Sequence, residues 1–324
     1  MIFRIAVLCC AFFCVTSCKK DAIDLKYSTV AFIEGVCIND VLVLSDTIIL
    51  FCGKTSLEQG RIGTFQRVTK KVELSKTDQI MHDLSGSADA LWACGNNMCV
   101  LKSVDTGRVW NPVWDAVYTS EFYDEENKTD IHKIHAVGSY PVFAIGYKNM
   151  LDGKLYVQNE NPVNPFKTKP LNMGVNDMLV VDSTEIYVAG YGSIVHVTGL
   201  DSNPLICSVG NENFTGITQV GTKSLVACTQ AGALYMYNGI DSVWKKTYQS
   251  SMSLTHVVGD TYGNLLAVGN GRHVLVSNNY GESWRKVRYP NSKHIRSLSF
   301  DSGYFWAGTE NGEIVRFDAV QIEK

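Results

Sequence analysis

The sequence of 324 residues predicts an all-β fold built from seven copies of one four-stranded unit. An apolar–polar–polar–apolar tetrad recurs, and the steps between the third residues of successive tetrads are 43, 50, 44, 39, 40 and 41 residues. The seven tetrads are Ile38–Val41, Met81–Leu84, Ile131–Ile134, Val175–Met178, Phe214–Ile217, Leu254–Val257 and Ile295–Leu298. An S-x-N/D-x-G-x-x-W box also occurs twice, at Ser103–Trp110 and Ser277–Trp284, about four units apart. Seven units of about 43 residues predict a seven-bladed β-propeller.

Each tetrad opens an inner strand, and a second apolar run containing small residues follows it. Small side chains in a second strand let neighbouring sheets approach closely. These second runs are Ile48–Gly53, Ala90–Gly95, Val142–Gly146, Ile186–Gly190, Leu225–Cys228, Leu265–Gly269 and Tyr304–Gly308.

A third run follows in each unit, after turns such as Asp152-Gly153 and Asn311-Gly312. The third runs are Gly63–Val68, Met98–Lys102, Lys154–Val157, Ile194–Thr198, Ala233–Tyr237, His273–Ser277 and Glu313–Phe317. A fourth, polar and aromatic strand is expected after them, for instance at Trp244–Tyr248 and Trp284–Tyr289.

The last unit is incomplete, because only seven residues follow Phe317. The strand-like segment Tyr27–Ile33 precedes the first tetrad and has no unit of its own. We predict that it pairs into the last blade and closes the ring, which leaves no open sheet edge at the junction. Residues 27–324 are therefore expected to form one domain. The extra residues of the longest unit lie in the acidic and aromatic segment Tyr118–Thr129. This segment is either a solvated connection or a site for calcium or a partner.

The first 17 residues read as an export signal. Arg4 supplies a positive start, Ile5–Val15 is an apolar stretch too short to span a bilayer, and Cys18 follows Ser17. This order resembles the lipobox of bacterial lipoproteins, which implies cleavage before Cys18 and lipid on Cys18. Residues 18–26 would then be a tether, and the protein would be an exported, membrane-anchored lipoprotein of the bacterial cell envelope. An ordinary signal peptide is the alternative.

Composition excludes some classes of function. The net charge of −3 makes nucleic acid an unsuitable partner. No phosphate-binding loop or nucleophile elbow occurs, and no cofactor or metal is predicted. The six cysteines after Cys18 include no C-x2-C pair. A hairpin disulfide between Cys94 and Cys99 is one option, but the apolar surroundings of several of the six favour buried thiols.

The two boxes resemble the Asp-box (BNR-like repeat) of sialidases and of propellers like the photosystem II stability and assembly factor. In that family the box is a hairpin between the third and fourth strands of a blade. The resemblance implies fold-stapling roles, with hydroxyl and amide or carboxylate groups holding the loop, glycine allowing positive φ and tryptophan packing between blades. The matching residues are Ser103, Asp105, Gly107 and Trp110, and Ser277, Asn279, Gly281 and Trp284. Sialidase chemistry is not implied, since the tetrads hold one arginine, Arg296, where those enzymes need a cluster.

The polar residues of the tetrads form two columns around the propeller axis. The first column is Asn39, His82, His132, Asn176, Thr215, Thr255 and Arg296. The second is Asp40, Asp83, Lys133, Asp177, Gly216, His256 and Ser297. Inner strands of a propeller line its central channel, so the columns predict a polar mouth for a sugar, a peptide or an ion. The alternative is a structural one, in which these side chains satisfy loop amides and hold channel water.

The function predicted from this pattern is that of a binding or assembly scaffold for a protein or glycan partner. The alternative is a carbohydrate-active enzyme, similar to glycoside hydrolases, that uses the carboxylates Asp40, Asp83 and Asp177 at the mouth. A metal site at His132 and His135 is not expected, because strand positions three apart point to opposite faces.

Overall fold

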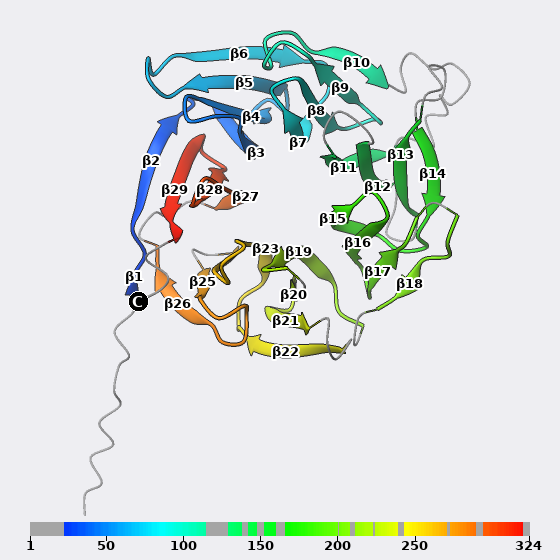
Figure 1. Ribbon diagram of the computed structural model, residues 1–324. Coiled ribbons are helices and arrows are strands. Elements are labelled where there is room, and N and C mark those ends of the chain that lie inside the picture. The colour runs from blue at the N-terminus through cyan, green and yellow to red at the C-terminus, as the bar shows by residue number, and fades with distance from the viewer. Residues whose placement is uncertain are drawn as a thin grey trace, which may run out of the picture.

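A computed structural model shows a ring of seven sheets, antiparallel except for one short added strand (Figure 1). This confirms the predicted seven-bladed β-propeller. The structure describes residues 23–114, 129–137, 142–147, 152–159, 166–199, 201–207, 211–222, 224–238, 243–270, 273–289 and 294–319. The predicted signal, Cys18 and residues 118–128 of the acidic segment lie outside these ranges. The described residues contain no helix long and apolar enough to cross a membrane.

In blades 1 to 5 the strands run from the axis to the rim in sequence order, and blades 6 and 7 each add an N-terminal strand at the rim. Blade 1 holds β3 (Val36–Val43), β4 (Ile48–Thr55), β5 (Gly60–Gln66) and β6 (Val72–Thr77). Blade 2 holds β7 (Met81–Ser87), β8 (Ala90–Gly95), β9 (Val100–Ser103) and β10 (Asn111–Trp114). Blade 3 holds β11 (Asp130–Ala136), β12 (Val142–Tyr147), β13 (Gly153–Gln158) and β14 (Phe166–Pro170). Blade 4 holds β15 (Val175–Asp182), β16 (Glu185–Gly190), β17 (Ile194–Val197) and β18 (Leu205–Ile206). Blade 5 holds β19 (Phe214–Val220), β20 (Ser224–Thr229), β21 (Ala233–Asn238) and β22 (Val243–Gln249). Blade 6 holds β23 (Leu254–Gly259), β24 (Leu265–Gly269), β25 (His273–Ser277), β26 (Arg285–Arg288) and the short β1 (Ile23–Asp24), and blade 7 holds β27 (Ile295–Asp301), β28 (Tyr304–Thr309), β29 (Glu313–Asp318) and β2 (Tyr27–Phe32).

The core lies between blades, because each sheet buries both faces of its second strand. Every residue of β8 is buried, including Trp92. One apolar cluster joins Trp306 and Ile314 of blade 7 to Ile38 and Phe51 of blade 1. Small second-strand residues make this approach feasible: a Cβ on Gly308 of blade 7 would lie 2.5 Å from a methyl carbon of Ile38 in blade 1.

The ring closes as the sequence predicts. β2 pairs antiparallel with β29, from Tyr27 opposite Phe317 to Phe32 opposite Glu313. The pairing continues at Ile33, whose amide donates to the Gly312 carbonyl at 2.7 Å. The added parallel strand β1 beside β26 was not predicted. Its two-residue pairing is too short to leave a periodic pattern in the sequence.

Both boxes form the same hairpin between the third and fourth strands of their blades. In blade 2 the Ser103 hydroxyl donates to Asp105 Oδ1 at 2.7 Å and accepts from the Gly107 amide at 3.1 Å. In blade 6 Ser277 makes the matching bonds, to Asn279 Oδ1 at 2.9 Å and from the Gly281 amide at 3.0 Å. Each tryptophan indole then donates to the carbonyl of the box glycine, at 3.0 Å for Trp110 and 3.1 Å for Trp284.

The box glycines also seat the hairpin against the preceding blade. Gly281 has φ +88°, and a Cβ there would lie 2.9 Å from a methyl carbon of Val226 in blade 5. We expect Gly281→Ala to lower the free energy of unfolding by about 1–3 kcal/mol beyond the backbone strain, because the packed neighbours must move. Gly303→Ala is the matched control: φ is +80° and no atom lies within 4 Å of the new Cβ, so only strain of about 1–2 kcal/mol remains. Urea unfolding of both variants measures the difference, and equal losses would refute the packing argument.

All six described cysteines are free thiols, so Cys94 and Cys99 do not form the hairpin disulfide considered above. Cys52, Cys94, Cys99 and Cys228 are buried. Burial raises the pKa of the Cys52, Cys94 and Cys228 thiols. These side chains act as small apolar residues of the core.

Candidate functional site

The inner strands share one irregularity at the tetrads. In every blade the pairing of the first two strands shifts register around the second tetrad residue. A β-bulge leaves its extra residue unpaired and re-aims the side chain. The bulged positions are the whole first column: Asn39, His82, His132, Asn176, Thr215, Thr255 and Arg296.

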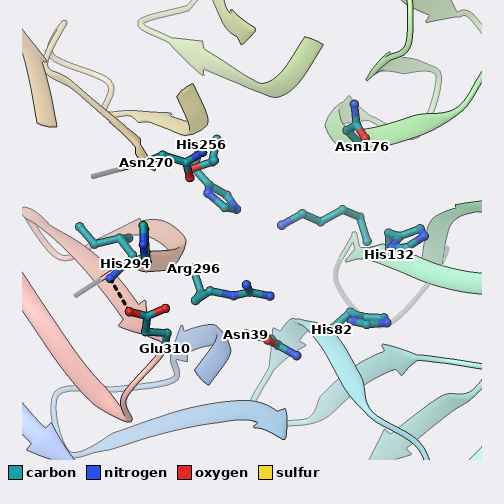
Figure 2. A pocket seen from close by; sticks show the side chains of 12 residues that line it. Asn39, His82, His132, Asn176, His256, Asn270, His294, Arg296 and Glu310 are labelled. Atoms are coloured by element: carbon teal, nitrogen blue, oxygen red, sulfur yellow. Dashed lines mark hydrogen bonds between the residues drawn. The ribbon is translucent and has the colours of Figure 1, made fainter. Parts of the chain in front are cut away.

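Six of the seven bulged residues line one cavity of about 460 Å³. Figure 2 shows Asn39, His82, His132, Asn176 and Arg296 around the same space. Lys133 and His256 of the second column also line it, as do Asn270, His294, Ile295 and Glu310. The seven-fold bulge thus brings together polar side chains separated by about 40 residues in the chain.

A third column, which was not predicted from the sequence, lies two residues beyond the second-strand partner of each second-column residue. Its members are Lys54, Asn96, Tyr147, Tyr191, Gln230, Asn270 and Glu310. Asn96 hydrogen-bonds the His82 ring, and Tyr147 stacks on His132 with centroids 4.6 Å apart. Only some of its members directly follow the glycine that ends the second run, and Gln230 and Glu310 do not, so strand register is needed to identify the complete column.

Gly216 and Ser297 aside, four residues of the two columns lie outside the cavity lining and connect neighbouring blades instead. Thr215 donates to the Leu254 carbonyl of the next blade at 2.9 Å. The three aspartates accept backbone amides from the next inner strand: Leu84 at 3.0 Å from Asp40, Ile134 at 2.8 Å from Asp83 and Ile217 at 2.9 Å from Asp177. A short buried carboxylate reaches these amides, and an unpaired buried amide would be costly.

The first column takes part in the same interblade bonding. Asn39 Nδ2 donates to the Met81 carbonyl at 2.8 Å, and Asn176 Nδ2 donates to the Phe214 carbonyl at 2.7 Å. These two residues therefore line the cavity while holding adjacent blades together. Both the ligand-site and the structural interpretations of the columns describe part of the arrangement.

Lys133 stands where three other blades carry an aspartate. Its ammonium lies 3.1 Å from Asp83 and 3.9 Å from Asp177. Burial acts to lower the pKa of Lys133, but Asp83, Asp177 and Asp40 raise it on balance, so the side chain is charged. Burial, followed by the charge of Asp83, raises the pKa of Asp40, and burial raises the pKa of Asp177.

Two histidines of the mouth, His132 and His256, are held neutral. Burial, with a contribution from His82, lowers the pKa of His132 to about 4. Burial, with Lys133 and Arg296 nearby, lowers the pKa of His256 to about 3. His132 Nε2, His256 Nδ1 and Asn39 Oδ1 are buried and have no hydrogen-bond partner within the structure. Orphaned buried polar atoms are uncommon and point to a bound molecule or water.

Solved propellers resemble this chain over nearly its whole length. A structure of YCF48 bound to D1 peptide matches with a TM-score of 0.72 at 13% identity, covering 92% of this chain and 98% of that one. The WD40 propeller domain of Doa1 matches at 0.69 and 12%, with coverages of 90% and 97%. Virginiamycin B lyase from Staphylococcus aureus matches at 0.70 and 10%, with coverages of 91% and 99%. These similarities establish the fold.

No protein-family model matches the sequence, and no curated protein matches it. The activities of the similar structures differ in kind, so fold alone does not select a function here. The chemistry must come from the mouth itself.

The mouth offers two cationic donors together with acceptors such as the Glu310 carboxylate and Asn39 Oδ1. Arg296 is exposed and makes no hydrogen bond or ion pair with any described residue. Lys133 adds an ammonium, and neutral imidazoles add N–H groups. The nearby aspartate oxygens already accept backbone amides. Within the described residues no group of three or more His, Cys, Asp or Glu side chains is arranged to hold a metal ion. The two cations, Arg296 and Lys133, suit a ligand that carries carboxylate or carbonyl groups.

Proposed function

We propose that this protein is an exported, lipid-anchored scaffold that binds a partner protein at the mouth of its propeller. The observation that carries the proposal is the cavity itself, lined by six bulged residues from six different blades. Repeating a local distortion around the ring gathers polar groups that no single blade holds. Open polar cavities on a rigid framework are the usual place for binding in such folds.

The cations Arg296 and Lys133 favour a peptide segment with acidic side chains as the ligand. Peptide carbonyls and acidic side chains are acceptors, and Arg296 can bond a carboxylate through two N–H groups. A solved propeller of the same fold is described as YCF48 bound to D1 peptide, which shows that this architecture can hold a peptide. Glycans remain the second class of partner, because their hydroxyls both donate and accept.

The glycoside hydrolase alternative receives less support. Asp40, Asp83 and Asp177 are the carboxylates it would use, yet each accepts an amide of the neighbouring blade. None of the three lines the cavity. Glycosidases need two carboxyl groups facing the substrate across an open space. Turnover of a glycan panel that Asp40→Asn or Asp177→Asn abolishes would restore that alternative.

Photo-crosslinking in cells tests the binding proposal. A photoreactive phenylalanine analogue at Asn270, on the mouth, is expected to trap a discrete partner protein. The same analogue at Tyr262, 77% exposed in the turn at the opposite end of blade 6, is the control and should trap none. Arg296→Glu should reduce the crosslink at least tenfold, because a like charge then meets the ligand acceptors. Equal crosslinks from both positions, or no effect of Arg296→Glu, would refute a partner at the mouth.

The lipid anchor is tested separately. Cys18→Ala is expected to abolish metabolic labelling with a radioactive fatty acid and to release the protein from the membrane fraction. Cys37→Ala, in blade 1, should leave both unchanged. If Cys18→Ala does not change the membrane fractionation, the anchor proposal is refuted. The binding proposal is not affected by that result.

A further inference from the structure

A second cavity of about 420 Å³ lies at the rim between blades 1 and 2. β6 forms one side of this rim groove, and the box hairpin of blade 2 forms the other. Its apolar lining comes from Ile62, Cys99, Leu101 and Trp110. The groove is remote from the mouth, because outer strands of the blades form the groove and inner strands form the mouth.

The junction of blades 5 and 6 shows how an equivalent groove is filled. In blade 1, Ile62 pairs with Cys52 on one side and with Ser75 of β6 on the other. In blade 5, Leu234 pairs with Cys228 and with Tyr248 of β22. Cys52 and Cys228 face equivalent tetrad positions, so Ser75 occupies the place of Tyr248.

This exchange changes the surroundings of the box tryptophan. Tyr248 packs against the apolar cluster that contains Trp284, which is only 8% exposed. A one-residue bulge in β22 also brings Thr247 to the Trp284 indole, which donates to its hydroxyl at 3.3 Å. β6 pairs with β5 without a bulge and carries the small Ser75 at this point. Trp110 is left half-buried beside a space of aromatic size.

The groove also carries a definite pattern of charge. Lys76 and Arg108 are both exposed and both line it. Asp78 is the one acidic residue among the residues described as lining the groove. Two cations beside a tryptophan favour an aromatic side chain flanked by carboxylates, through cation–π contact and charge pairing.

The outer strand supplies a backbone template as well. Five of the six residues of β6 are exposed, and β6 is the outermost strand of its blade. Blade 6 shows that an outer strand of this molecule accepts an added segment, because β1 pairs with β26 there. A segment paired with β6 would place one side chain directly beside Ser75, on the face that looks into the groove.

We propose that the rim groove binds an extended acidic segment of a partner protein by inserting one tyrosine or phenylalanine side chain beside Trp110. The segment adds to the edge of β6, and its aromatic ring occupies the space that Tyr248 fills between blades 5 and 6. Lys76 and Arg108 hold the flanking carboxylates. This site is independent of the mouth and of the function proposed for it.

The test uses the full chain in mild detergent and a capped pentapeptide with a central tyrosine between two glutamates. Nuclear magnetic resonance follows the Trp110 indole N–H, which Trp110→Phe identifies by its loss. The peptide is expected to shift this signal saturably, and a matched peptide with alanine in place of tyrosine is not. Ser75→Tyr should weaken binding at least tenfold by filling the groove, whereas Tyr248→Ser should leave it unchanged. Lys76→Glu should weaken binding most at low salt.

Several results would overturn the proposal. They are equal binding of the alanine peptide, no shift of the Trp110 signal, or undiminished binding to Ser75→Tyr. If sedimentation instead shows a dimer that Ser75→Tyr dissociates, and the peptide does not bind, the groove is a contact between two copies of the chain. Ser75→Leu serves as the second groove-filling variant if circular dichroism shows that Ser75→Tyr disturbs the fold.

Discussion

Replacing Lys133 by methionine is expected to lower the free energy of unfolding by about 3–5 kcal/mol at pH 7. The substitution removes the ammonium that lies between Asp83 and Asp177 and leaves their carboxylates buried without a cation. The side chain of Asp83 is 8% exposed, so water cannot replace the lost partner. Urea unfolding at pH 7 measures the loss.

The pH dependence of this variant gives a second readout. Without Lys133 the cation that lowers the pKa of Asp177 is lost, so this raised pKa rises further and the folded state binds more protons than the unfolded state. Stability then decreases as pH rises through the raised pKa of Asp177, and it recovers as pH falls through it. Asp40 and Asp177, whose pKa values are already raised, contribute with the same sign in the wild type.

Lys154→Met is the matched control in the same blade. Lys154 pairs with Asp152 at 3.8 Å, but both side chains are more than a third exposed. Surface pairs of this kind contribute about 0–1 kcal/mol. A Lys133→Met protein as stable as Lys154→Met between pH 5 and pH 8 would show that the buried ion pairs do not hold the inner strands together.

Removing residues 1–33 is expected to destabilise the ring by more than about 4 kcal/mol and to cause aggregation. The deletion takes away β2, the outer strand of blade 7, together with the buried side chains of Ala31 and Ile33. Each large apolar side chain buried on folding contributes about 1.5–3 kcal/mol. The edge of β29 would also be exposed, and unprotected edges pair with other chains.

Removing residues 1–22 alone is the control for that deletion. It leaves β1 and β2 in place, so the melting temperature should be unchanged. Thermal unfolding and size-exclusion chromatography distinguish the two variants. If the chain that begins at Glu34 unfolds at the same temperature as the control, closure by β2 does not stabilise the ring.

The period of the tetrads was enough to predict the number of blades and the closing strand. Each tetrad pairs an apolar position that packs between blades with a polar position near the axis, so its spacing is fixed by the size of a blade. The segment Tyr27–Ile33 stood out because the last unit lacked a fourth strand. These features are encoded locally and repeat, which makes them readable from one sequence.

Which polar column residues line the mouth and which connect the blades could not be predicted from the sequence in the same way. Asp83 and Lys133 occupy equivalent positions, yet one is buried under the mouth and the other lines it. Whether a second-column side chain is buried or lines the mouth depends on the bulge at the preceding residue and on the charge of the facing residue in the neighbouring blade. Such contacts join residues about 40 or more positions apart, and no spacing rule specifies them. Glu310 and Asn270 were missed because their column becomes visible only once strand register is known.

The parallel pairing of β1 with β26 has a consequence for how the molecule is presented. Ile23 is five positions from Cys18, and five residues span at most about 18 Å. A lipid on Cys18 would therefore hold the outer edge of blade 6 close to the bilayer. The mouth at the propeller axis, with Arg296 beside it, would then lie farther from the membrane than this edge.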